Sequence, residues 1–212
     1  MPAPKGPRVV LAPDSFKGSM TAPLAAAAMG RGVRQVLPEA QCVPLPMSDG
    51  GEGLASILAA ALGGVWREVK VRGPLGLSVT AGFGWVEQDR LAVIESASAA
   101  GLDLVPDAAR DVLRASTFGV GELMAAALQA GAERIVLGLG GTATNDGGAG
   151  LAQALGVRLL DKSGWDLGPG GAALAGLDRI DTTGLDPRWA QVSVQVACDV
   201  DNPLLGERGA SA

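Results

Sequence analysis

The stretch RIVLGLGGTATNDGGAGLAQALG, residues 134–156, combines three signals that together predict an α/β unit. Residues 135–137 form a short apolar run, which has the length and composition of a buried strand. A glycine-rich loop follows, and then a small-residue helix over 151–155 that Gly156 ends. A strand, a glycine-rich turn and a helix start make a cradle for an anion, because backbone N–H groups can point at an oxyanion there.

Asp146 in this loop changes what the cradle can do, because its charge would repel a bare phosphate. It fits if a cation lies between the carboxylate and the phosphate, or if Asp146 takes a proton from a hydroxyl. Both possibilities point to phosphoryl transfer. The groups that would cradle the anion are Gly140, Gly141, Thr142, Gly147 and Gly148.

Composition excludes several classes of function. The chain has 212 residues, a net charge of -5 and no basic stripe, which argues against binding nucleic acid. No apolar run approaches the ~20 residues of a membrane span, and the first eight residues lack a secretory signal. We therefore expect a cytoplasmic protein without a membrane partner. Histidine and tyrosine are both absent, so acid–base chemistry falls to Asp, Glu or Lys.

The order of elements predicts two regions. Buried strands and helices alternate at the start of the chain, whereas alternating hairpin strands begin near Val65, which marks a domain boundary. The predicted strands are 8–12, 41–45, 65–73, 78–86, 91–94, 135–137, 157–160 and 191–197, and the predicted helices are 22–36, 54–62, 123–130 and 151–155.

The pattern D-G-G-x-G-L-A occurs twice, at residues 49–55 and 146–152. It suggests one device used twice, an acid just before a helix whose glycines permit a close approach. Asp49 as a plain helix cap is the competing interpretation, although capping does not explain the glycines. Ser48 and Glu52 belong to the same loop. Glu95 follows a buried strand, and it either faces a cleft or turns to solvent.

The loop after the first strand supplies Asp14, Ser15 and Lys17, where open α/β sheets place ligands. Lys-Gly-Ser at 17–19 lacks the glycine spacing of a phosphate-binding Walker A loop, so that match is rejected. A turn-capping Asp and a solvated Lys remain the structural alternative. After the last predicted strand come Asp199 and Asn202.

Four segments in this order resemble the bacterial glycerate kinase family: APDSFKGS (12–19), PMSDGGEG (46–53), GGTATNDGG (140–148) and ACDVDNPL (197–204). The resemblance implies ATP-dependent phosphorylation of D-glycerate with Mg²⁺ by a two-domain α/β protein. It implies a parallel-sheet first domain built from both chain ends and a second, mixed α/β domain inserted between them. Residues 1–65 would begin the first domain, and residues 66–212 would form the inserted one.

Family chains continue well beyond the segment that matches residue 204. We therefore expect an incomplete first domain whose sheet a homo-oligomeric partner could complete. As catalytic groups we predict Asp14, as the candidate base, with Lys17, Asp49 and Asp146. As metal ligands we predict Asp146 and Asp199. The substrate or phosphate contacts are Ser15, Ser48, Glu52, Gly140, Gly141, Thr142, Asn145, Gly147, Gly148 and Asn202.

This assignment requires Asp14, Asp49, Asp146 and Asp199 to meet in one crevice. The main alternative is a non-catalytic module that holds an anion without turning it over. A Rossmann-type oxidoreductase is disfavoured, because its ribose-binding acid would have to be Asp161 and three of the four segments would stay unexplained.

Overall fold

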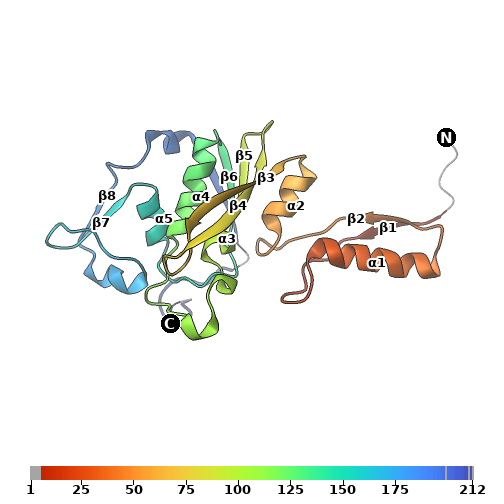
Figure 1. The fold of residues 1–212 in the computed structure, drawn as a ribbon, viewed down its shortest axis with the longest axis horizontal. Coiled ribbons are helices and arrows are strands. Elements are labelled where there is room, and N and C mark those ends of the chain that lie inside the picture. Colours follow the sequence, from red (N-terminus) through yellow and green to blue (C-terminus); the bar gives the residue numbers. More distant parts are fainter. Residues whose placement is uncertain (1–5, 199, 210, 212) are drawn as a thin grey trace.

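A computed structural model describes residues 6–198, 200–209 and 211. Its N-terminal unit contains β1 (Arg8–Leu11), α1 (Ala22–Val36) and β2 (Gln41–Pro44), and this unit projects from one end of the molecule (Figure 1). The two strands pair in parallel, with Arg8 opposite Gln41, and among the described residues they form a sheet of their own. Helix α1 is formed by the alanine-rich run. A proline lies in its first turn, where the backbone N–H would have no partner within the helix.

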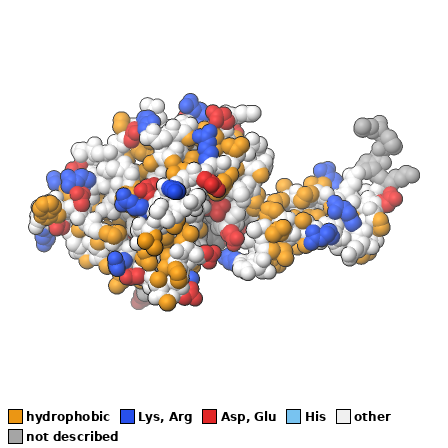
Figure 2. Space-filling view, viewed as in Figure 1, with side chains coloured by type: hydrophobic (Ala, Val, Ile, Leu, Met, Phe, Trp, Pro, Cys, Tyr) orange, Lys and Arg blue, Asp and Glu red, His pale blue; other side chains and the backbone are white. Residues whose placement is uncertain are grey.

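This N-terminal unit leaves much apolar surface exposed, which Figure 2 shows as hydrophobic side chains crowded along it. Val10 on β1 is 56% exposed and Val36 at the end of α1 is 80% exposed. Parallel sheets normally have both faces covered. In the described part of the chain, the two-stranded sheet of the N-terminal unit is therefore incomplete, as predicted.

The main body is built on a five-stranded mixed sheet in the order β3-β4-β5-β6-β9. The first three strands form an antiparallel meander, whereas β6 and β9 lie parallel to β5. Its strands are β3 (Val65–Arg72), β4 (Ser78–Val86), β5 (Leu91–Glu95), β6 (Arg134–Gly138) and β9 (Ser193–Ala197). The carboxyl ends of β5, β6 and β9 consequently share one edge of the sheet, and that edge positions the candidate site.

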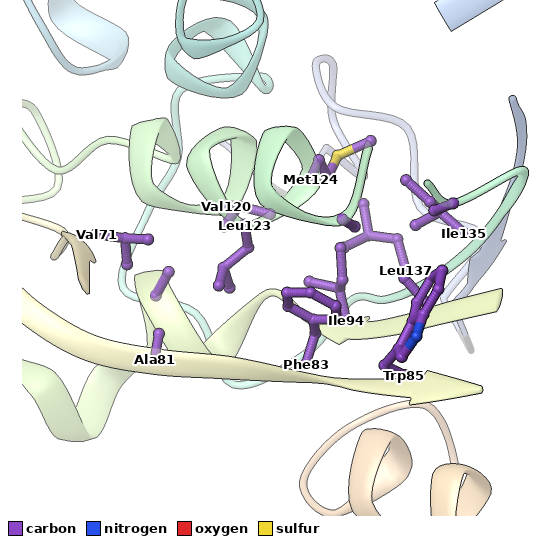
Figure 3. Close-up of a cluster of buried hydrophobic side chains, with 14 of the residues drawn as sticks. Val71, Ala81, Phe83, Trp85, Ile94, Val120, Leu123, Met124, Ile135 and Leu137 are labelled. Carbon is purple, nitrogen blue, oxygen red and sulfur yellow. The ribbon is translucent and has the colours of Figure 1, made fainter. Parts of the chain in front are cut away.

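Helices cover both faces of this sheet. Helix α4 (Phe118–Gln129) packs on one face with α5 (Ala149–Ala154), and α2 (Leu54–Ala61) packs on the other, against β4 and β5. Side chains alternate along β5 accordingly, because Ile94 joins the core under α4 and Val93 joins the cluster under α2. Figure 3 shows Phe83, Trp85 and Ile94 below α4, with Leu123 pointing into the same core.

Shorter elements complete the main body. They are α3 (Ala97–Ala100), the antiparallel pair β7 (Arg158–Leu160) and β8 (Arg179–Asp181), and four 3₁₀ helices, Leu102–Leu104, Asp107–Ala109, Gly171–Gly176 and Pro187–Gln191. Within the described ranges, no helix has the length and apolarity needed to span a bilayer.

Helix α4 starts five residues before the predicted start, because two of its glycines are packing positions rather than loop signals. A Cβ on Gly119 would collide with the carbonyl oxygen of Arg72, and one on Gly121 would lie 2.5 Å from that of Leu151. The glycines let α4 approach β3 and α5 closely. The predicted boundary near residue 65 stays a prediction, and α2, which precedes it, packs on the sheet that follows it.

Candidate functional site

Three loops meet at the carboxyl edge of the sheet. The Leu139 N–H after β6 donates to the Ala197 carbonyl at the end of β9, at 2.9 Å. Between them lies Gly50, whose absent Cβ would be 3.2 Å from the same Ala197 oxygen. A Cβ on Gly138 would in turn collide with the Gly50 carbonyl oxygen. The glycines in the 49–53 and 138–141 loops therefore permit a backbone-to-backbone contact that larger residues would prevent.

The loop after β2 presents two exposed carboxylates beside this contact. Asp49 accepts the Gly51 N–H at 3.0 Å, which closes a tight local turn, and Glu52 is exposed two residues before α2. The Ser48 hydroxyl accepts the Gly50 N–H at 3.4 Å. Gly140 lies against Gly51, since a Cβ on Gly140 would be 3.4 Å from the Cα of Gly51. The structure thus brings the loop of Asp49 and Glu52 to the loop of Gly140 and Gly141, as the sequence predicts.

The loop of Asp14 and Lys17 adjoins the same region through the backbone. The Met47 N–H donates to the Pro13 carbonyl at 2.9 Å, so the segment after β1 runs beside the one that leads to Ser48. Asp14 accepts the Ser15 N–H at 2.6 Å and is exposed, as is Lys17 in the turn between Phe16 and Met20. Parallel pairing of β1 and β2 explains this arrangement, because it puts both carboxyl ends at one edge.

Glu95 is the functional candidate that sequence reasoning left undecided. It ends β5 opposite Gly138, and its Oε1 accepts the Ala55 N–H in the first turn of α2 at 2.7 Å. Burial raises the pKa of its carboxyl above the ordinary value, and the nearby charge of Glu52 acts in the same direction. The backbone N–H groups of Ala55 and Gly53 oppose both effects. Glu95 therefore faces the meeting point of the loops instead of turning to solvent.

Ser96 adds an unusual donor next to Glu95. It is 3% exposed, and its hydroxyl has no hydrogen-bond partner among the described residues, whereas its backbone N–H donates to the Gly138 carbonyl at 2.9 Å. Buried hydroxyls normally have partners. The Ser96 hydroxyl is therefore an exception, a buried polar group without a partner among the described residues.

The sequence context of Asp146 suggests that it faces the site, but the structure buries it inside the protein. Its side chain is 1% exposed, and both oxygens accept bonds from within the protein. The donors are the Thr117 N–H (2.8 Å), the Thr117 hydroxyl (3.0 and 3.1 Å), the Gly148 N–H (3.1 Å) and the Gly150 N–H (3.1 Å). With its lone pairs occupied in this way, Asp146 fits an internal anchor better than a magnesium ligand or a base. Thr117 is the partner that a sequence pattern alone could not assign to it.

The remaining predicted residues that the structure describes have contacts of their own. Asn145 accepts the Ser211 hydroxyl at 2.7 Å, and Gly147 lies near Leu204, so this end of the loop contacts the last described residues. A cavity of about 410 Å³ lies there. Asn202 donates to the Arg208 carbonyl at 3.2 Å, Thr142 bridges to Gly101, and Gly148 begins α5. Asp199 lies outside the described residues.

The described residues offer no ready-made cage for the predicted magnesium ion. In the described part of the chain, no three Asp, Glu, Cys or His side chains cluster closely enough to hold a metal ion. Mg²⁺ is commonly bound by only one or two carboxylates together with substrate phosphates and water. The exposed carboxylates of Asp49 and Glu52 meet that smaller requirement, whereas that of Asp146 does not.

Comparison with known proteins places this arrangement in one family. Residues 9–212 match the glycerate kinase family profile. The chain is 54% identical to glycerate kinase of Halalkalibacterium halodurans over 203 residues, which are 96% of this chain and 53% of that protein. It is 48% identical to glycerate 2-kinase of Escherichia coli, over 96% of this chain and 54% of that one.

A crystal structure agrees with these sequence matches. It is that of a protein assigned as glycerate kinase 2 from Salmonella typhimurium LT2, with a TM-score of 0.84 and 48% identity over 97% of this chain and 56% of that one. The chain spans about half the length of the relatives it matches. The match covers the loops described above from Asp14 onward, and the chain belongs to the glycerate kinase family.

Proposed function

We propose that this chain provides the substrate-binding loops of an ATP-dependent D-glycerate kinase. The observation that carries the proposal is the contact between the Asp49–Glu52 loop and the Gly138–Gly141 loop at the carboxyl edge of the sheet. Family membership supplies the reaction class, and the absence of histidine agrees with chemistry performed by carboxylates and lysine.

In this proposal the backbone of the loop at Gly140 and Gly141 binds the phosphates of ATP. Gly141 has a φ of +61°, a conformation that glycine adopts without strain and that turns successive N–H groups toward one side. Lys17 is exposed and supplies a mobile positive charge for a phosphate or for the glycerate carboxylate.

The reaction forms a bond between the γ-phosphorus and a hydroxyl oxygen of glycerate, breaks the bond to the bridging oxygen of ADP, and releases the hydroxyl proton. Asp14 is an exposed carboxylate that can accept this proton. Magnesium carried by the triphosphate would neutralise the developing charge, and Asp49 and Glu52 are the groups that would hold it. Phosphorylation of the 2-hydroxyl is the outcome that the name of the Escherichia coli relative supports.

A coupled assay that measures ADP release with and without D-glycerate tests the proposal on the purified chain. Glycerate-dependent ADP release, with ³¹P NMR showing 2-phosphoglycerate, would support it. The non-catalytic alternative predicts that calorimetry detects binding of ATP or glycerate while no ADP is released. Failure to detect either binding or turnover would contradict both.

A further inference from the structure

A second recess lies away from the loops just described. It has a volume of about 460 Å³ and lies between the β3–β4 turn, the start of α4 and the segment that follows α5. None of the residues in the 48–53 or 138–142 loops lines it. Its size is within the usual range of small-molecule sites, about 300–1,000 Å³.

Three arginines line this cavity, and they differ in how they are paired. Arg158 forms two hydrogen bonds with Asp166, at 3.0 and 2.8 Å. Arg72 lies 3.4 Å from a carboxylate oxygen of Glu122. Arg114 forms no ion pair with any other described residue. Arg114 is therefore the lining arginine without an ion-pair partner among the described residues, and such a guanidinium favours an anionic ligand.

Arg72 also offers a flat surface. Its guanidinium lies over the Phe118 ring, 4.0 Å from the ring centroid, and its side chain is 57% exposed. Phe118 and Glu122 both contact the guanidinium, and the exposed part of the side chain leaves surface for a planar group. Arginine planes stack well on heteroaromatic rings, with an attraction that is both electrostatic and apolar.

Part of the remaining wall is apolar, whereas Ser116, Gln153 and the Asp166 carboxylate, which pairs with Arg158, are polar. Leu75, Val157 and Leu167 line the cavity. The Gln153 amide donates to the Leu167 carbonyl at 3.0 Å, and the Leu167 N–H donates to the Leu159 carbonyl at 2.8 Å. A small hydroxy acid such as glycerate has no apolar part to cover this wall, whereas a ring system does.

We propose that this cavity binds a mononucleotide, with its base against Arg72 and the apolar wall and its phosphate at Arg114. The proposal rests on the charge, planarity and volume of the cavity and does not depend on phosphoryl transfer. Ser116 and Phe118 line the cavity on either side of Thr117, the partner of Asp146. A bound nucleotide would therefore contact the segment that anchors the glycine-rich loop.

Titration calorimetry with AMP on the 212-residue chain tests the proposal. Arg114→Gln should weaken AMP binding about tenfold, the loss expected when a charge-assisted contact disappears. Arg72→Lys should also weaken AMP binding, because it keeps the positive charge but removes the planar guanidinium on which the base would stack. Arg31→Gln on α1 is the matched control for charge and should not change AMP affinity.

Two results would overturn the proposal. One is AMP affinity that falls with Lys17→Gln and not with Arg114→Gln, which would place the nucleotide at the other loops. The other is inorganic phosphate that competes as well as AMP, since the ring would then contribute nothing. Thermal unfolding of each variant checks the fold. Arg114→Lys provides a second test if Arg114→Gln is unstable, with an expected affinity between those of the wild type and the Gln variant.

Discussion

Thr117 and Asp146 join the first turns of two helices that are far apart in the sequence. The Thr117 hydroxyl donates to the Asp146 carboxylate and accepts the Leu151 N–H at 2.9 Å, while the carboxylate also accepts the N–H groups of Gly148 and Gly150. N-terminal N–H groups of a helix have no partner within the helix. One carboxylate and one hydroxyl therefore satisfy N–H groups at the start of α5, and the same carboxylate accepts the N–H of Thr117, the N-cap residue of α4.

Asp146→Ala should destabilise the fold, because it leaves buried N–H donors without an acceptor. We expect a loss of about 3 kcal/mol in the free energy of unfolding, measured by urea denaturation. Asp178→Ala, an exposed acid, is the control and should change stability by no more than about 0.5 kcal/mol. An Asp146→Ala variant of wild-type stability but without kinase activity would instead return Asp146 to the catalytic role that the sequence suggested.

Thr117→Val removes only the hydroxyl and keeps the shape of the side chain. The Leu151 N–H then loses its acceptor and Asp146 loses one donor, so we expect a loss of about 1–2 kcal/mol in stability. Thr117→Ser retains the hydroxyl and should lose clearly less. Equal losses in the two variants would mean that the methyl group, and not the hydrogen bonds, accounts for the effect of Thr117.

Local patterns in the sequence predicted most strands and helices well, because apolar periodicity and glycine punctuation are local signals, but they did not predict β8. Helix α1 at Ala22–Val36 and strand β4 at Ser78–Val86 have the predicted bounds. The predicted start of α4 was wrong because Gly119 and Gly121 resemble loop residues. Glycine is required at these positions by close contact with Arg72 and Leu151. The same limit explains Asp146 and Glu95, whose roles depend on Thr117 and Ala55 at distant positions in the chain.

Gly138→Ala tests the contact between the two loops of the candidate site. The added methyl group would collide with the Gly50 carbonyl, so the loops must separate. We expect kcat/KM for glycerate phosphorylation to fall at least tenfold, as misplacement by about 1 Å can cost a hundredfold. Gly168→Ala is the control, because nothing lies within 4 Å of its Cβ position. Unchanged kinetics in Gly138→Ala would show that this contact does not position the substrates.

Lys17→Gln should weaken substrate binding without affecting stability. Lys17 is exposed in its turn, so its removal leaves no buried group unpaired. If its charge contacts a phosphate or the glycerate carboxylate, KM should rise about tenfold, and the dependence of KM on salt should become weaker. Lys162→Gln, an exposed lysine in a different turn, should leave KM unchanged. A normal KM in Lys17→Gln would remove this residue from the proposed site.

Glu95→Gln should change how stability depends on pH. Since burial raises the pKa of Glu95 in the folded state, the folded chain binds the proton of the Glu95 carboxyl group more tightly than the unfolded chain does. Its contribution to stability is present below the unfolded pKa and is lost as pH rises through the folded pKa. Glutamine cannot ionise, so the stability of Glu95→Gln relative to wild type should increase with pH across that window and then level off. The total increase should be about 1.4 kcal/mol for each unit by which the folded and unfolded pKa values differ. Urea denaturation between pH 4 and pH 8 measures this difference, and a constant difference at every pH would contradict the raised pKa.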